Sequence, residues 1–183
     1  MKKLFMGVLI LMVLLFAGCS ADKPETKAKS ESAQTKMDNS LDKLPLFPIT
    51  LDKFISGYNS TSGVVPIKEG KLMKLDNKGY YKDLIYEETK DSQLMLRAIY
   101  GHDKKLRRIS FIQKLPDDQI LNDKGIAILN GTIHSLGIRA NQLTDFLNSE
   151  ETIGFFNENG YYVQITKMSP GLFTLIIDKA TEN

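Results

Sequence analysis

Few residues in this chain have the types and spacing that metal or enzyme chemistry requires. The 183 residues include one cysteine, Cys19, and two histidines, His102 and His134. A structural zinc site needs four ligands, usually from cysteine and histidine, and the chain has no His-x-x-x-His motif and no cysteine pair. We therefore expect no metal and no other cofactor. We interpret His102 as a solvated turn residue and His134 as a half-buried helix residue.

Nucleophilic catalysis is not indicated either, because it needs a serine or cysteine beside a base and an oxyanion hole. The chain has no Gly-x-Ser-x-Gly elbow, and its Ser-x-x-Lys spacings, at Ser20 and Ser40, fall in a polar segment where we expect no fixed helix. Acidic residues occur as adjacent pairs, and neighbours in a strand face opposite sides and form no acid–base dyad. We assign no catalytic residue.

Four cations lie close together in the sequence: Lys104, Lys105, Arg107 and Arg108. If they begin a strand, Lys105 and Arg107 share one face while Leu106 and Arg108 share the other. Such a surface could contact anionic headgroups or wall polymers. The alternative is a solvated strand start that discourages edge pairing.

Tyrosines form a second candidate surface, because the side chain combines a broad apolar ring with a hydrogen-bonding tip. Two Gly-Tyr-Tyr turns present them in pairs, Tyr80 with Tyr81 and Tyr161 with Tyr162. Strand alternation should turn about half of the tyrosines inward, so core packing competes with recognition. The sequences around the two turns resemble each other. Either recurrent turn chemistry or an internal duplication explains this similarity.

The N-terminus has the layout of a secretory signal. Lys2 and Lys3 precede thirteen uncharged, mostly large apolar residues at positions 4–16, and the small Ala17 and Gly18 follow. This run is too short to span a bilayer comfortably, since a core of roughly 30 Å needs about 20 residues.

Residues 16–19, Phe-Ala-Gly-Cys, resemble the lipobox of bacterial membrane lipoproteins. The resemblance covers only the first twenty residues, and Phe16 departs from the usual aliphatic residue. It implies that the Cys19 thiol receives a diacylglyceryl group, that a signal peptidase cuts before Cys19, and that Cys19 becomes the mature N-terminus. Because two acyl chains anchor a protein stably, the resemblance implies a lipid-anchored protein on the extracytoplasmic face of the cell membrane.

The mature chain has no net charge. Without Lys2 and Lys3 the 24 basic residues become 22, equal to the 22 acidic residues, which argues against nucleic-acid binding. Residues 20–44 carry five lysines and five acidic residues with almost nothing to bury, so we predict a disordered tether. The predicted organisation is a signal peptide at 1–18, a lipidated cysteine and tether at 19–44, and one domain at 45–183.

Periodicity predicts both helices and strands in that domain. Thr50 is an expected N-cap for a helix whose apolar stripe is Leu51, Phe54, Ile55 and Tyr58. Further helices are expected around 126–136, with a stop at Gly137, and around 141–148. Strand-like runs separated by short turns lie at 71–76, 80–88, 93–100, 105–114, 152–157, 161–168 and 172–178.

Short connections imply antiparallel pairing, and Asn159-Gly160 is a strong hairpin signal. The predicted fold class is α+β, with an antiparallel sheet of about six to seven strands and two to three helices packed on it. We expect a membrane-anchored domain that binds a protein, peptide or envelope component without catalysis. A small cell-envelope hydrolase and a structural or inhibitory module are the alternatives.

Overall fold

The computed structural model describes residues 40–76, 78–116, 120–168 and 171–181. The predicted signal segment, Cys19 and most of the predicted tether lie outside these residues. The described elements, in chain order, are α1 Ser40–Lys43, α2 Leu51–Asn59, β1 Met73–Lys74, β2 Tyr80–Glu88, β3 Gln93–Tyr100, β4 Leu106–Lys114, α3 Asp123–Ser135, α4 Ala140–Asn148, β5 Ile153–Glu158, β6 Tyr161–Met168 and β7 Leu172–Lys179. Within these ranges, no helix is long and apolar enough to cross a membrane.

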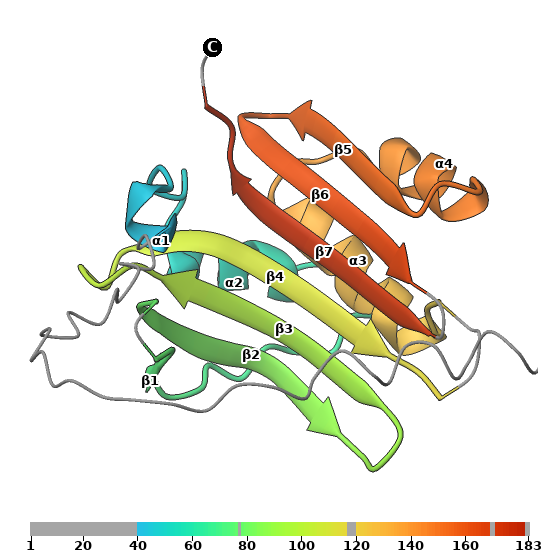
Figure 1. Cartoon of the computed structure of the whole chain (residues 1–183), viewed down its shortest axis with the longest axis horizontal. Helices are drawn as coiled ribbons and strands as arrows, with labels where there is room; N and C mark the ends of the chain where they lie inside the picture. Colours follow the sequence, from blue (N-terminus) through green and yellow to red (C-terminus); the bar gives the residue numbers. More distant parts are fainter. Residues whose placement is uncertain (1–39, 77, 117–119, 169–170, 182–183) are drawn as a thin grey trace, which may run out of the picture. The chain divides into compact units, whose positions relative to one another are not determined.

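The strands form one seven-stranded sheet in the order β1-β2-β3-β4-β7-β6-β5, with every neighbouring pair antiparallel (Figure 1). The predicted α+β class and the predicted meander from β1 to β4 are both confirmed. The last strand, β7, pairs with β4 and so joins the N-terminal meander to the C-terminal hairpin at the centre of the sheet.

Local hydrogen bonds explain where the helices begin and end. The Thr50 hydroxyl accepts a bond from the backbone N–H of Lys53 at the start of α2, as an N-cap side chain does. At the end of α3, Gly137 has a φ of 65°, and the N–H of Ile138 donates to the carbonyl of Ile133 at 2.9 Å. This is the Schellman stop predicted at Gly137.

The hairpin predicted at Asn159-Gly160 is also confirmed. Asn159 and Gly160 have φ values of 51° and 78°, which is the pair of positive angles that a two-residue turn of type I′ requires. Glu158 and Tyr161 pair on either side of this turn.

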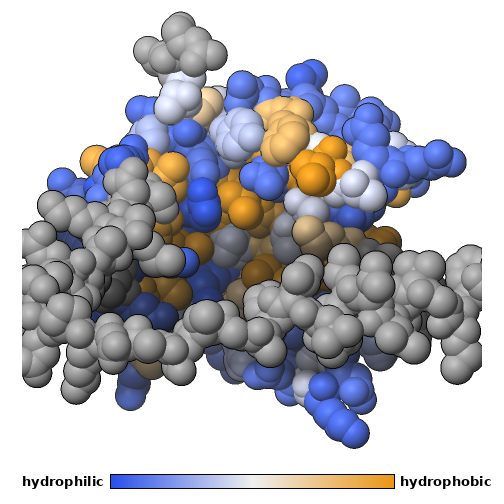
Figure 2. Space-filling view, in the orientation of Figure 1, coloured by the Kyte–Doolittle hydropathy of each residue, from blue (hydrophilic) through white to orange (hydrophobic). Residues whose placement is uncertain are grey.

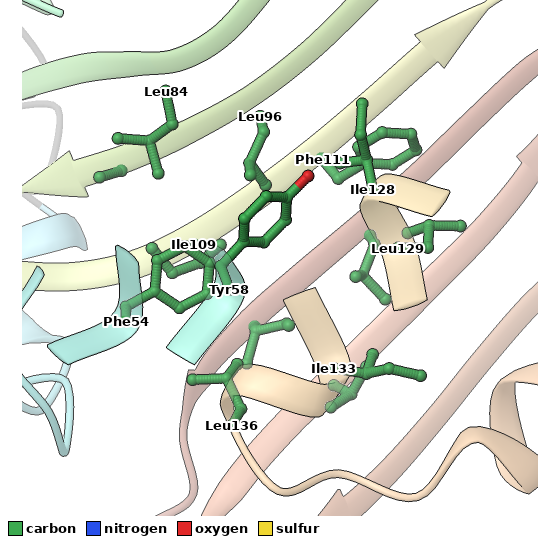
Figure 3. Close-up of a cluster of buried hydrophobic side chains, with 14 of the residues drawn as sticks. Phe54, Tyr58, Leu84, Leu96, Ile109, Phe111, Ile128, Leu129, Ile133 and Leu136 are labelled. Atoms are coloured by element: carbon green, nitrogen blue, oxygen red, sulfur yellow. The ribbon is translucent and has the colours of Figure 1, made fainter. Parts of the chain in front are cut away.

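The hydrophobic core lies between one face of the sheet and helices α2 and α3 (Figure 3). Phe54 and Tyr58 of α2 meet Ile109 and Phe111 of β4, and all four side chains are completely buried. Burying a large apolar side chain contributes about 1.5–3 kcal/mol. The predicted apolar stripe of the first helix therefore anchors α2 to the sheet.

Two residues before position 45 contact the folded domain. Leu41 in α1 is buried, and the Leu44 carbonyl accepts a bond from Arg107 Nη1 at 2.9 Å. The polar composition of residues 20–44 concealed this contact, because one buried leucine and one carbonyl suffice for it. Residues 41 and 44 therefore contact the domain, although the sequence pattern placed them in the tether.

Candidate functional site

One face of the sheet carries no helix in the described part of the chain. Figure 1 is seen from this side, with α2 and α3 behind the strands. On β4 and β7 the core residues alternate with residues that point away from the helices, since successive side chains of a strand face opposite sides. We call the surface on the side away from α2 and α3 the open face.

The strand register arranges the open face in rows. The first row runs through Tyr81, Ile99, Arg108, Asp178, Tyr162 and Asn157. The second row consists of Asp83, Arg97, Ser110, Ile176, Gln164 and Phe155. The third row consists of Tyr86, Met95, Ile112, Thr174, Thr166 and Ile153.

Apolar side chains are unusually frequent on this surface. The side of an antiparallel sheet that faces water normally carries polar residues, yet Phe155 is 59% exposed, Ile153 49% and Tyr86 48%. Figure 2 shows apolar residues gathered on this side of the molecule with hydrophilic residues around them. Large apolar patches rimmed by polar residues mark interaction sites, so the open face is the candidate binding surface.

The second Gly-Tyr-Tyr turn divides its tyrosines between core and open face. Tyr161 is 3% exposed and packs against Phe47 with ring centroids 5.3 Å apart, and burial raises the pKa of its hydroxyl. Tyr162 lies on the open face and stacks on Phe155, with centroids 6.2 Å apart and planes 16° apart. Phe155 and Tyr162 therefore form one aromatic surface.

The first Gly-Tyr-Tyr turn divides its tyrosines in the same way. Tyr80 packs against the core and is half-buried. Tyr81 lies on the open face, where the Arg97 guanidinium sits 3.9 Å from its ring centroid. Arg97 also donates from Nε to Asp83 at 2.7 Å. Of the four predicted tyrosines, the structure thus brings Tyr81 and Tyr162 to one surface and turns Tyr80 and Tyr161 away from it.

The four predicted cations do not form one cationic face. Arg108 donates two bonds to the Asp178 carboxylate, both at 2.7 Å. Arg107 is largely buried, and its Nη2 donates to Asp103 at 2.6 Å. Lys104 and Lys105 are the two exposed members of the group, and the Lys104 amine lies 5.5 Å from the centroid of the Tyr80 ring.

A register shift explains this separation. Tyr100 pairs with Leu106, but the preceding Ile99 pairs with Arg108, so Arg107 is an extra residue in β4. Such a bulge interrupts strict alternation. Leu106 joins the core and Arg108 faces Asp178. The prediction that Leu106 and Arg108 share a face is therefore wrong.

Neither histidine has the partners of a catalytic triad among the described residues. His102 Nδ1 lies 2.7 Å from Asp42, and its backbone N–H donates to the same carboxylate at 2.8 Å, but no hydroxyl contacts this ring. His134 is exposed and not half-buried as predicted. Its Nδ1 lies 3.1 Å from the Thr61 hydroxyl but has no carboxylate partner. In the same residues, no group of three or more His, Cys, Asp or Glu side chains is arranged to hold a metal.

The contact between Asp42 and His102 joins α1 to the turn between β3 and β4, and it predicts a pH effect. Hydrogen bonds from the backbone and the ring of His102 hold the pKa of Asp42 below its ordinary value of 3.8. A carboxyl whose folded-state pKa is lowered contributes stability above its unfolded pKa and loses it as pH falls through the folded value. We expect Asp42→Asn to lower the melting temperature near neutral pH, by a difference that shrinks below about pH 4.

Thermal unfolding monitored by circular dichroism from about pH 7 down to about pH 2.5 measures this difference. Asp91→Asn, at an exposed turn, is the matched control and should change the melting temperature little at any pH. A difference for Asp42→Asn that stays constant across the range would contradict the role assigned to this carboxylate.

Several hollows adjoin the open face, and two of them lie near Tyr162 and Phe155. One, of about 360 Å³, lies at the end of its first row and is lined by Leu44, Pro45, Asn157, Tyr162, Asp178, Lys179 and Thr181. The other is a groove of about 340 Å³ between α4 and β5, lined by Gln142, Asp145, Phe146, Ser149, Glu151, Gly154, Phe155, Phe156 and Ile165. Residues of this groove were not predicted from the sequence. The signal available was the run Ile153-Gly154-Phe155-Phe156, which places apolar side chains on both faces of its strand.

The fold and the open face define an α+β domain with a one-sided sheet and an exposed, aromatic-rich surface. Comparisons of the chain with protein-family models, with curated proteins and with solved structures find no match. The function must therefore be inferred from the surface itself.

Proposed function

We propose that this chain is a bacterial lipoprotein, anchored through Cys19 to the extracytoplasmic face of the cell membrane, whose domain binds a protein or peptide without catalysing a reaction. The observation that carries the binding function is the open face. The lipobox resemblance of residues 16–19 supports the anchor. The predicted tether would then connect the membrane to the domain.

The composition of the open face supports a protein or peptide partner. The buried centres of protein interfaces are enriched in aromatic residues, methionine and arginine. The open face contains members of each class, including Tyr81, Phe155, Arg97 and the exposed Met168. Fully burying one large apolar side chain contributes about 1.5–3 kcal/mol, so a few such residues are enough to hold a partner.

The ion pairs on the open face support the same interpretation. The side chains of Arg97 and Arg108 each bond to a carboxylate on a neighbouring strand, Asp83 and Asp178 respectively. Each arginine charge is balanced by the carboxylate that it contacts, so the pair does not attract distant anions. The same hydrogen bonds hold each guanidinium in place, where it can contact a bound partner. A membrane-binding role for the predicted cation group loses support, because Arg107 and Arg108 are both committed to carboxylates.

Site-specific photo-crosslinking in the native membrane tests this proposal. A photoreactive residue in place of Gln164, on the open face, should capture a discrete partner, whereas the same residue in place of the exposed Asn130 on α3 should not. The double substitution Tyr162→Ala and Phe155→Ala should weaken capture about tenfold or more, since central aromatic residues dominate interface energies. Capture should change little with salt, because apolar contact is not screened.

Ile126→Ala is the matched control, since Ile126 is an exposed apolar residue on α3 at 42% exposure. It should leave capture unchanged. Strong, salt-sensitive flotation of the lipid-free chain with anionic vesicles, lost on neutralising Lys104 and Lys105, would replace this proposal with a membrane-contact function.

A further inference from the structure

The edge of the sheet at β5 lacks several of the features that prevent strands from pairing with another chain, and α4 runs beside it with a groove between them. In the described residues the strand order ends at β5, which pairs only with β6. Proteins shield sheet edges with short strands, lysine, proline, bulges, or a helix or loop that covers the edge. The opposite edge strand, β1, has two residues, including Lys74. In contrast, β5 has six residues, contains no lysine or proline, and pairs with β6 without a register shift.

The backbone groups of this edge point outward at alternate residues. Glu158 and Tyr161 flank the two-residue turn and exchange backbone bonds, as such hairpins require, and the Lys167 N–H donates to the Thr152 carbonyl at 2.7 Å. Antiparallel strands alternate between bonded and non-bonded pairs. The N–H and C=O groups of Ile153, Phe155 and Asn157 therefore point away from β6.

The groove beside this edge is lined by apolar side chains together with acidic and polar ones. Asp145 and Glu151 line it, and no lysine or arginine does. The nearby Lys167 amine donates to the carbonyls of Phe146 and Ser149, so its donors are directed at the end of α4. Phe146 fills the space beside Gly154, where a Cβ atom would come within 2.6 Å of the ring. The groove thus has an apolar wall and a negatively charged margin.

We infer that the groove between α4 and β5 binds an extended peptide segment with alternating apolar and basic residues, which adds to β5 as an eighth strand. Strand addition supplies backbone hydrogen bonds for affinity and alternate side-chain sites for specificity. The apolar residues would extend the open face next to Ile153 and Phe155, and the basic residues would meet Asp145 and Glu151. This inference rests on the proposed binding function and specifies the chemistry of the partner.

The test uses the full chain as isolated from cells and a fluorescent heptapeptide of alternating valine and lysine, with binding followed by fluorescence anisotropy. A peptide with glutamate in place of lysine should bind about tenfold more weakly or not at all, because its charge matches that of the groove. Asp145→Asn combined with Glu151→Gln should remove most of this preference. Glu150→Gln, an exposed neighbour that does not line the groove, should retain it.

Backbone methylation separates strand addition from simple charge attraction. In an added strand, the N–H groups of only one alternate set face β5. Two further peptides are methylated on backbone nitrogens, one at its valines and the other at its lysines. They should therefore differ in their affinity for the chain. One should lose about tenfold or more in affinity, since about three backbone bonds are lost, and the other should bind nearly normally.

Equal binding of the two methylated peptides, or equal binding of the lysine and glutamate peptides, would overturn the inference. A concentration-dependent dimer seen by sedimentation, competing with the peptide, would assign the edge to a second copy of this chain and overturn it too. If the peptide test failed while a photoreactive residue at position 164 still captured a partner, only the strand-addition inference would be rejected. The two experiments therefore distinguish failure of this inference from failure of the proposed function.

Discussion

A chain carrying Cys19→Ala is expected to incorporate no lipid at all. Thioether formation needs a thiol, and Cys19 is the only cysteine among the 183 residues, so no other side chain can replace it. With the acyl chains absent, the remaining attachment would be an uncleaved apolar segment of thirteen residues, which is shorter than the roughly 20 residues that a bilayer requires.

Metabolic labelling with an alkyne-tagged fatty acid, followed by fractionation of membranes and medium, measures both consequences. Phe16→Leu is the matched control, because it restores the aliphatic residue usual in a lipobox and should keep labelling at least as strong. Undiminished labelling of the Cys19→Ala chain would remove the lipoprotein assignment, whereas loss of label with the protein still in the membrane would indicate a second attachment.

Replacing Arg108 with alanine is expected to destabilise the domain by about 3 kcal/mol, at the lower end of the cost of breaking a buried ion pair. The Asp178 side chain is 10% exposed and the Arg108 side chain 25%. Removing the guanidinium leaves the Asp178 carboxylate poorly solvated and without its two charged hydrogen bonds. The cost arises from this uncompensated charge. Because β4 and β7 lie at the centre of the sheet, water has little access to the Asp178 carboxylate.

Denaturant unfolding followed by circular dichroism gives the change in the free energy of unfolding. The double substitution Arg108→Met and Asp178→Leu should recover most of the loss, since replacing both members of a buried pair by apolar residues is often close to neutral. Lys105→Ala, at an exposed position, should stay within about 0.5 kcal/mol of the starting protein. If Arg108→Ala left stability unchanged but abolished binding to anionic vesicles, Arg108 would be a contact residue and not a structural one.

Elements determined by neighbouring residues could be predicted from the sequence. The Thr50 cap, the Gly137 stop and the Asn159-Gly160 turn each depend on groups within about five positions of one another, through side-chain hydrogen bonds or positive φ angles. The strand runs at 80–88, 93–100 and 161–168 coincide with β2, β3 and β6, because their turn residues and alternation are equally local.

Contacts between distant segments could not be predicted in this way. Leu41 lies in a charged segment, and its burial depends on the segments that fold around α1. The extra residue at Arg107 and its bond to Leu44 depend on how β3 and β4 align. Arg108 has an expected position in a strand, but its partner Asp178 is 70 residues away.

By itself, the sequence determined most of the secondary structure, although not α1, and it determined the α+β class. It also determined that the two tyrosines of each Gly-Tyr-Tyr turn lie on opposite faces of their strand. It did not determine which face α2 and α3 would cover. Alternation specifies which residues share a face, because successive side chains of a strand point in opposite directions. Only the packing of distant helices decides which of the two faces becomes the core. That packing buried Tyr161 and left Tyr162 with Phe155 on the open face.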